Sequence, residues 1–210
     1  MSSRSQALKS IFITGWLLAL TALVGTGMMA VVNWHSGPYI KNNERETLLR
    51  SLNSVLPANI YNNDILNDTI KLVEKQYLGS DAPAIIYRAR KGKKPTGAAL
   101  KVVAPNGYSG DIVLLVGVNY AGKITGVRVV KHKETPGLGD GIEIQRSNWI
   151  ESFTGKSLSN PGRSQWKVKR DGGSFDQFTG ATITPRAVVG AVHKALTFFD
   201  NNRDKIFSVL

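Results

Sequence analysis

The 210-residue chain contains no cysteine, which rules out disulfide bonds, cysteine-ligated iron–sulfur clusters and c-type haem. Histidine is scarce as well, with three residues scattered along the chain. Neither a Ser/His/Asp arrangement nor a Gly-x-Ser-x-Gly motif is present, so a free-standing serine hydrolase is not indicated. Any redox cofactor must therefore be held without thiolate ligands.

Acidic residues are also few, because 15 Asp and Glu stand against 27 Lys and Arg, for a net charge of +12. Such an excess suits a membrane surface, an acidic partner or nucleic acid. Nucleic acid is disfavoured because most basic residues are scattered and no nucleic-acid-binding motif accompanies them. The one local cluster consists of Arg88, Arg90, Lys91, Lys93 and Lys94.

Charge is absent altogether from Ser10 to Trp34, a run rich in Leu, Val, Ile and Met. At about 1.5 Å per residue, a helix of this length exceeds the roughly 30 Å of hydrocarbon in a bilayer. A cleaved signal peptide is the alternative, but its apolar region is normally about 7 to 15 residues long, and no Ala-x-Ala pattern closes this stretch. The sequence thus predicts a transmembrane helix over residues 10–34.

The flanking charges predict the orientation of this helix. Arg4, Lys9 and the amino terminus precede it, without an acidic residue. By the positive-inside rule, residues 1–9 are expected in the cytoplasm. The rest of the chain is then expected in the periplasm of a bacterium, anchored to the inner membrane, or outside a cell with a single membrane.

Residues 35–80 are predicted to form a stalk ahead of the folded domain. Leucine and valine side chains spaced three or four apart predict an amphipathic helix over residues 44–56 that is stopped by Pro57. The pattern of residues 64–79 does not decide between helix and strand.

The domain expected over residues 81–210 begins with apolar runs separated by turn residues. These predict strands over residues 84–90, 97–104, 111–120 and 124–131, paired as antiparallel hairpins. The basic cluster falls on the expected turn at 91–96, where a solvated loop is the simplest interpretation. A helix over residues 142–153 and a short strand over 166–169, with Trp166 in the core, complete the expectation before the last helix.

The closing helix is expected to begin at Thr184 and Pro185, because a threonine hydroxyl caps a helix and proline fits its first turn. Its apolar stripe would cover one face of the sheet and give an α+β fold. Immediately before it, Thr179 and Thr182 flank the small residues Gly180 and Ala181. Since a helix N-terminus favours negative charge, the sequence indicates an anion site here.

Three motifs carry a resemblance to a known family. Asp176-x-x-Thr179-Gly180-Ala181-Thr182-x-Thr184 resembles the flavinylation motif of proteins that carry covalent FMN in the Rnf and sodium-pumping NADH:quinone oxidoreductase complexes. The run Glu134 to Gly139, Glu-Thr-Pro-Gly-Leu-Gly, and the run Gly107-Tyr108-Ser109-Gly110 also occur in such proteins. The order of the parts is most similar to the RnfG family of the Rnf electron transport complex, and the related C-type component of the sodium-pumping complex is the neighbouring alternative.

This resemblance implies the roles of individual residues. FMN would be esterified through its phosphate to the hydroxyl of Thr182, and Asp176 would be recognised by a flavin transferase. Lys169 could neutralise the phosphate or the reduced flavin, although a surface lysine is the more frequent case. The remaining residues implied in cofactor binding are Thr179, Gly180, Ala181, Thr184, Glu134, Thr135, Gly137, Leu138 and Gly139. His132 and Glu134 form only two potential metal ligands, so a metal site is not predicted.

The function implied is electron relay by a membrane-anchored protein on the periplasmic side of an ion-translocating complex. The chain would have no independent catalytic site, and its partners would be the other subunits, a periplasmic flavin transferase and membrane lipid. A module that binds FMN noncovalently, or an assembly subunit without a cofactor, remains the alternative.

Overall fold

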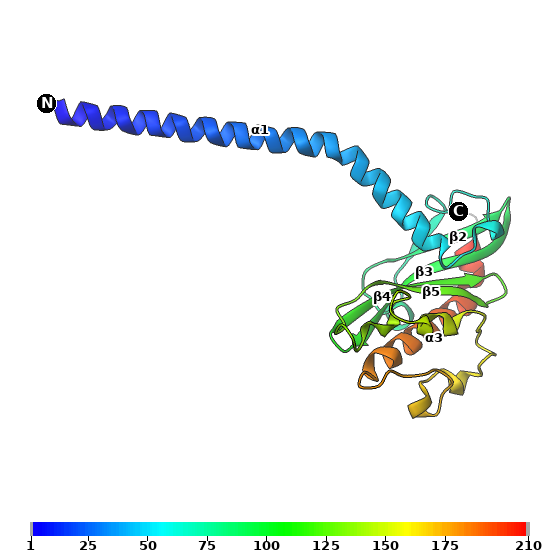
Figure 1. Ribbon diagram of the computed structural model, residues 1–210. Helices are drawn as coiled ribbons and strands as arrows, with labels where there is room; N and C mark the ends of the chain where they lie inside the picture. Colours follow the sequence, from blue (N-terminus) through cyan, green and yellow to red (C-terminus); the bar gives the residue numbers. More distant parts are fainter. Residues whose placement is uncertain (1, 209–210) are drawn as a thin grey trace. The chain divides into compact units, whose positions relative to one another are not determined.

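The computed structural model describes residues 2–208, without the side chains of residues 2–11, 36–42 and 44. It contains two compact units, one up to Leu48 and the other Leu49–Leu210 (Figure 1). The side chains of Arg4 and Lys9, on which the expected orientation rests, lie outside the described residues.

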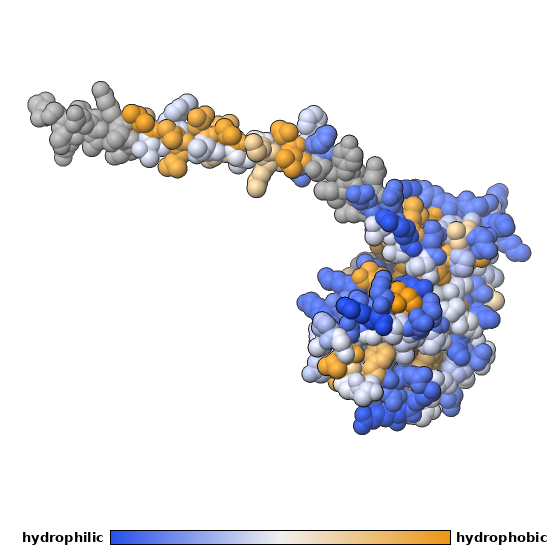
Figure 2. Space-filling model, in the orientation of Figure 1, coloured by the Kyte–Doolittle hydropathy of each residue, from blue (hydrophilic) through white to orange (hydrophobic). Residues whose placement is uncertain are grey.

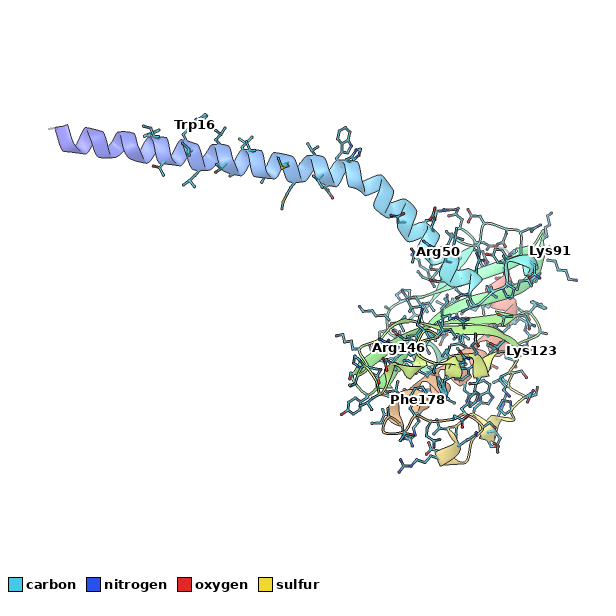
Figure 3. All side chains as sticks on the ribbon, viewed as in Figure 1. Trp16, Arg50, Lys91, Lys123, Arg146 and Phe178 are labelled. Carbon is cyan, nitrogen blue, oxygen red and sulfur yellow. The ribbon has the colours of Figure 1, made fainter. Side chains whose placement is uncertain are left out.

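The first unit consists of most of a long helix, α1, Ser2–Asn53. Its stretch Phe12–His35 is long and apolar enough to cross a membrane, and its side chains are all exposed. Figure 2 shows these apolar side chains on the helix surface, and Trp16 projects from it in Figure 3. An exposed apolar helix of this length is unfavourable in water and supports a membrane anchor. The predicted amphipathic helix is the last part of α1, which ends at Asn53, four residues before Pro57.

The second unit is built on a five-stranded antiparallel sheet with the strand order β1-β2-β3-β4-β5. The strands are β1 Thr69–Leu72, β2 Ala84–Lys91, β3 Lys94–Gly107, β4 Gly110–Asn119 and β5 Ile124–Lys131. The undecided segment therefore contains an edge strand, followed by the short helix α2, Lys75–Leu78. Residues 49–80 thus include part of the sheet.

The hairpin between β2 and β3 is tighter than the sequence predicts. Pairing extends to Lys91 and Lys94, so the turn consists of Gly92 and Lys93 and not of residues 91–96. Gly92 adopts a φ of 61°, which glycine allows without steric cost. Lys91, Lys94 and Pro95, which the sequence pattern assigned to the turn, are instead paired residues at the ends of the two strands.

Helix α3, Ile183–Phe207, covers one face of the sheet as predicted (Figure 1). Alternate residues of the central strands point toward it, because side chains in a strand alternate between faces. The buried core on this side includes Leu100, Val102, Ile112, Leu114, Val116, Val188, Val192, Leu196 and Phe199. The α+β architecture is confirmed.

The residues that follow α1 pack against the opposite face of the sheet. Val55 and Leu56 are buried there, and the Thr125 hydroxyl donates a hydrogen bond to the Val55 carbonyl. A Cβ added to Gly117 would lie 2.2 Å from the same carbonyl oxygen, so a glycine is required for this close approach.

Two further predicted elements are wrong. Residues 142–153 form separate 3₁₀ turns, η2 Asp140–Ile142 and η3 Asn148–Phe153, in place of one α-helix. The Ser147 hydroxyl accepts a hydrogen bond from the Trp149 N–H and so forms the N-cap of η3. The strand predicted over residues 166–169 is a single bridge between Val168 and Phe175, although Trp166 is buried as expected.

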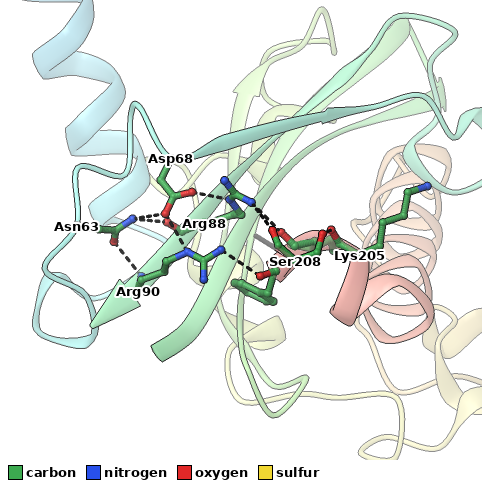
Figure 4. A network of polar contacts seen from close by, with 8 residues as sticks. Asn63, Asp68, Arg88, Arg90, Lys205 and Ser208 are labelled. Carbon is green, nitrogen blue, oxygen red and sulfur yellow. Dashed lines mark hydrogen bonds and ion pairs between the residues drawn. The ribbon is translucent and has the colours of Figure 1, made fainter. Parts of the chain in front are cut away.

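The basic cluster divides into two groups, of which Figure 4 shows the first, Arg88 and Arg90. Arg88 and Arg90 are mostly buried, and both form ion pairs with Asp68 through their Nε atoms, at 2.5 and 3.0 Å. They also donate to the carbonyls of Ile206, Phe207 and Ser208, which end α3 and lack helical partners. The solvated-loop interpretation is therefore wrong for this pair. The remaining three residues of the cluster, Lys91, Lys93 and Lys94, are exposed, and Lys91 lies at the outer end of the hairpin (Figure 3).

His193 on α3 stacks on the buried ring of Trp166, with centroids 5.4 Å apart and planes 10° apart. Burial lowers the pKa of His193 from its ordinary value of 6.5, and the positive charge of Arg163 lowers it further. The folded protein therefore holds the neutral imidazole more strongly than the unfolded chain does.

The lowered pKa of His193 implies that the free energy of unfolding decreases at acidic pH. Because the folded-state pKa of His193 is depressed, the unfolded chain binds the proton more readily as the pH falls below about 6.5. We expect the melting temperature to fall between pH 7.5 and pH 5 in both proteins, and to fall less in His193→Gln than in wild type. Thermal unfolding at the two pH values checks this, and equal losses in both proteins would contradict it.

Candidate functional site

Three chain segments meet beside the first turn of α3. They are the turn 107–110 between β3 and β4, the loop 134–139 after β5, and the segment 180–184. They enclose a pocket of about 300 Å³ lined by Tyr108, Glu134, Thr135, Leu138, Gly139, Gly180, Ala181, Thr182, Ile183 and Thr184. Eight of the twelve residues singled out from the sequence therefore lie together.

Local hydrogen bonds shape the loop 134–139. The Gly139 N–H donates to the Thr135 carbonyl at 3.0 Å, and the Gly137 N–H donates to the Asp140 carboxylate at 2.8 Å. Gly137 has a φ of 78°, a conformation that a residue with a side chain adopts only with strain. The loop thus forms a compact turn that brings Leu138 and Gly139 to the pocket.

The start of α3 differs from the prediction. The helix begins at Ile183, with Thr182 as its N-cap residue and Thr184 already inside the first turn. The Thr184 hydroxyl donates to the Glu134 carboxylate and does not cap the helix. Pro185 remains acceptable because N–H groups of the first turn have no helical partner.

The three threonines of the motif have different surroundings. Thr184 is 1% exposed and committed to Glu134, and Thr179 is exposed outside the pocket. Thr182 is partly exposed, lines the pocket and makes no side-chain capping bond. Of these three hydroxyls, that of Thr182 alone is both in the pocket and reachable.

The Glu134 carboxylate lies at the centre of the arrangement. It is 4% exposed and accepts hydrogen bonds from the backbone N–H groups of Tyr108 and Ser109, at 3.2 and 2.9 Å, and from the Thr184 hydroxyl. Its oxygens are therefore occupied by the protein itself. The motif resemblance assigned this side chain to the flavin and gave no sign of these bonds, because they join residues 25 to 50 positions apart.

Four of the predicted site residues lie outside the pocket lining. Gly137 and Thr179 line a neighbouring open groove that also contains Arg146 and Phe178 (Figure 3). Lys169 forms an ion pair with Asp176, with 2.6 Å between Nζ and Oδ1, and both side chains are more than half exposed.

Tyr108 and Ile183, which were not among the predicted site residues, form the apolar rim of the pocket together with Leu138. Tyr108, Ile183 and Leu138 are 68%, 45% and 48% exposed, although large apolar residues are more often buried. The only signal in the sequence is the Gly-Tyr-Ser-Gly turn itself. An exposed apolar rim around a pocket is typical of a ligand site.

The two potential metal ligands are engaged elsewhere. His132 Nε2 lies 2.8 Å from a Glu143 oxygen, and His132 Nδ1 accepts the backbone N–H of Glu134. No group of three His, Asp or Glu side chains that could hold a metal occurs among the described residues.

Comparison with known proteins agrees with this geometry. Residues 107–197, which contain all three segments of the pocket, match the model of the FMN-binding domain. Residues 1–55 match the RnfG N-terminal region.

Relatives extend the similarity over nearly the whole chain. A protein of Shewanella baltica (strain OS223) is 46% identical over 195 residues, covering 93% of this chain and 92% of the relative. A protein of Pseudomonas aeruginosa (strain UCBPP-PA14) is 48% identical over 200 residues, covering 95% of this chain and 94% of the relative. Both are named as the G subunit of an ion-translocating oxidoreductase complex. The chain belongs to this family. The resemblance found in the motifs is thereby confirmed, and so is the expectation that the chain is part of an oxidoreductase complex.

Proposed function

We propose that this chain carries FMN in the pocket, with the phosphate esterified to the Thr182 hydroxyl, and relays electrons on the periplasmic side of the membrane. The observation that carries the proposal is the partly exposed Thr182 hydroxyl, free of capping, at a helix start inside the FMN-binding domain. A hydroxyl is the group that a phosphoester requires.

The residues of the pocket fit this cofactor. The first turn of α3 contains no acidic residue, and its N–H groups and dipole favour a phosphate. Gly180, with a φ of 80°, lets the backbone come close to the ligand beside Thr182. Tyr108, Leu138 and Ile183 provide apolar contacts for the isoalloxazine ring. When bound, FMN supplies one- and two-electron chemistry, while the protein supplies position and electrostatics.

The exposed segment ahead of the pocket suits recognition by a second protein. Asp176 and its ion-pair partner Lys169 lie outside the pocket lining. We propose that the flavin transferase binds here and reaches Thr182, and that Lys169 acts mainly through Asp176.

The membrane anchor sets the location. With Phe12–His35 in the bilayer and Arg4 and Lys9 on the short side, we infer from the positive-inside rule that the chain after this helix lies in the periplasm, next to the other subunits of the complex and the lipid surface. Covalent attachment suits that compartment, because a flavin lost there by dissociation is not easily replaced.

Intact mass of the full chain, purified from membranes that contain the transferase, tests the proposal. We expect a mass increase of one FMN less one water that survives denaturation. Flavin that separates on denaturation would indicate noncovalent binding, and a colourless native complex with the unmodified mass would indicate an assembly role without a cofactor. A copy produced in the cytoplasm, away from the transferase, is the control and is expected to lack flavin.

A further inference from the structure

The most unusual charge in the second unit is that of Glu134. It is buried beside the pocket, and among the described side chains, those of residues 12–35, 43 and 45–208, no Lys, Arg or His forms an ion pair with it. A buried carboxylate without a cation is costly unless hydrogen bonds compensate it. Here two backbone N–H groups and one hydroxyl do so, and the positive end of α3 lies close by.

Two glycines lie close against the Glu134 side chain. A Cβ added to Gly107 would lie 2.9 Å from Glu134 Oε1, and a Cβ added to Gly139 would lie 2.9 Å from Glu134 Cβ and 3.0 Å from Thr184 Oγ1. Glycines on two sides therefore let the turn 107–110, the loop 134–139 and the first turn of α3 close around one side chain.

We infer that Glu134 is a positioning residue for flavin attachment: it fixes the first turn of α3 against the other two walls of the pocket, so that the Thr182 hydroxyl faces the incoming phosphate. This inference rests on the proposed attachment at Thr182. Thr184 follows Thr182 by two residues in the same helical turn, so holding its hydroxyl fixes the direction of that turn. The bond also withdraws the Thr184 hydroxyl from competition for the phosphate.

The chemistry of the side chain makes Glu134→Gln a sharp test. The Tyr108 N–H points at one oxygen and the Ser109 N–H at the other. An amide has a single oxygen, so whichever way it turns, one N–H group faces the amide NH₂. The glutamine has nearly the same volume but cannot accept all three hydrogen bonds, and its NH₂ group is forced against a backbone N–H of the turn 107–110.

We expect Glu134→Gln to slow covalent flavin incorporation about tenfold to a hundredfold, the effect of a small displacement of a reacting group. The measurement is intact mass over time in the full chain, in membranes that contain the transferase. Glu151→Gln, which removes an exposed carboxylate paired with Arg128, is the matched control and is expected to incorporate flavin like wild type.

A second pair of variants separates positioning from folding. Thr184→Val removes the hydroxyl donor with little change in volume and is expected to slow incorporation, while Thr184→Ser keeps the donor and is expected to restore it. In the fraction of Glu134→Gln that does carry flavin, we expect a raised midpoint potential, because a negative charge that lines the proposed flavin pocket has been removed. A general loss of stability would not raise the potential of the flavin that is bound.

The possible outcomes are distinct. Wild-type rates in both Glu134→Gln and Thr184→Val would overturn the inference while leaving the proposed function intact. A wild-type chain without covalent flavin under the same conditions would overturn the proposed function itself. If Glu134→Gln shows no cooperative unfolding, the Thr184→Val and Thr184→Ser rates decide.

Discussion

Thr182→Val should carry no covalent flavin, whereas the wild-type chain from the same membranes should carry one FMN. Valine has nearly the shape of threonine but offers no oxygen for a phosphoester. Thr182 makes no side-chain capping bond, so its loss should leave the helix start intact. Intact mass under denaturing conditions measures the result, and thermal unfolding verifies the fold.

The control for this variant is Thr197→Val. Thr197 lies on the same helix and is similarly half-buried, but its hydroxyl donates to the His193 carbonyl, far along α3 from the pocket. It should retain the flavin. Covalent flavin on Thr182→Val would place the attachment on another residue and refute the assignment.

Asp68→Ala should destabilise the second unit by about 3 kcal/mol, since removing one partner of a mostly buried ion pair leaves uncompensated charge. Two arginines depend on this carboxylate, and both also hold the last carbonyls of α3 (Figure 4). For a domain of this size the melting temperature should fall by about 6–12 °C. Thermal unfolding of the full chain in detergent measures it.

Asp81→Ala is the matched control, because it also removes an aspartate from an ion pair, here with Lys75 at 2.6 Å, but both side chains are largely exposed. Exposed pairs contribute about 0–1 kcal/mol, so the melting temperature should hardly move. Equal shifts in the two variants would show that the Asp68 network adds no more than a surface pair.

The α+β fold was predictable from patterns that depend on neighbours in the sequence. The continuous apolar run from Ile112 to Val118 marked a strand, and the spacing of Val188, Val192 and Leu196 marked a helix. Where a local pattern has several solutions, prediction failed. Residues 142–153 have apolar spacing that suits a helix, yet they form 3₁₀ turns because the Ser147 hydroxyl and packing against the sheet decide.

The candidate site shows the same division. The motif around Thr182 and the Glu-Thr-Pro-Gly-Leu-Gly loop were visible as sequence, since both are continuous runs. That these two runs lie beside one pocket was implied only by the family resemblance. The sequence assigned no role to Tyr108 or Ile183. The exposure that marks these two residues as a rim belongs to the folded surface and has no signature in the chain.

By itself, then, the sequence determined the membrane helix, the sheet and its covering helix, and the motif that carries the family resemblance, because each is a repeat or run readable over a few neighbouring residues. Only the tertiary structure decided that Glu134 holds Thr184 and the 107–110 turn, and that Arg88 and Arg90 hold the end of α3 through Asp68. These bonds join residues 20 to 120 positions apart, and a buried polar group takes whichever partner the fold brings within reach.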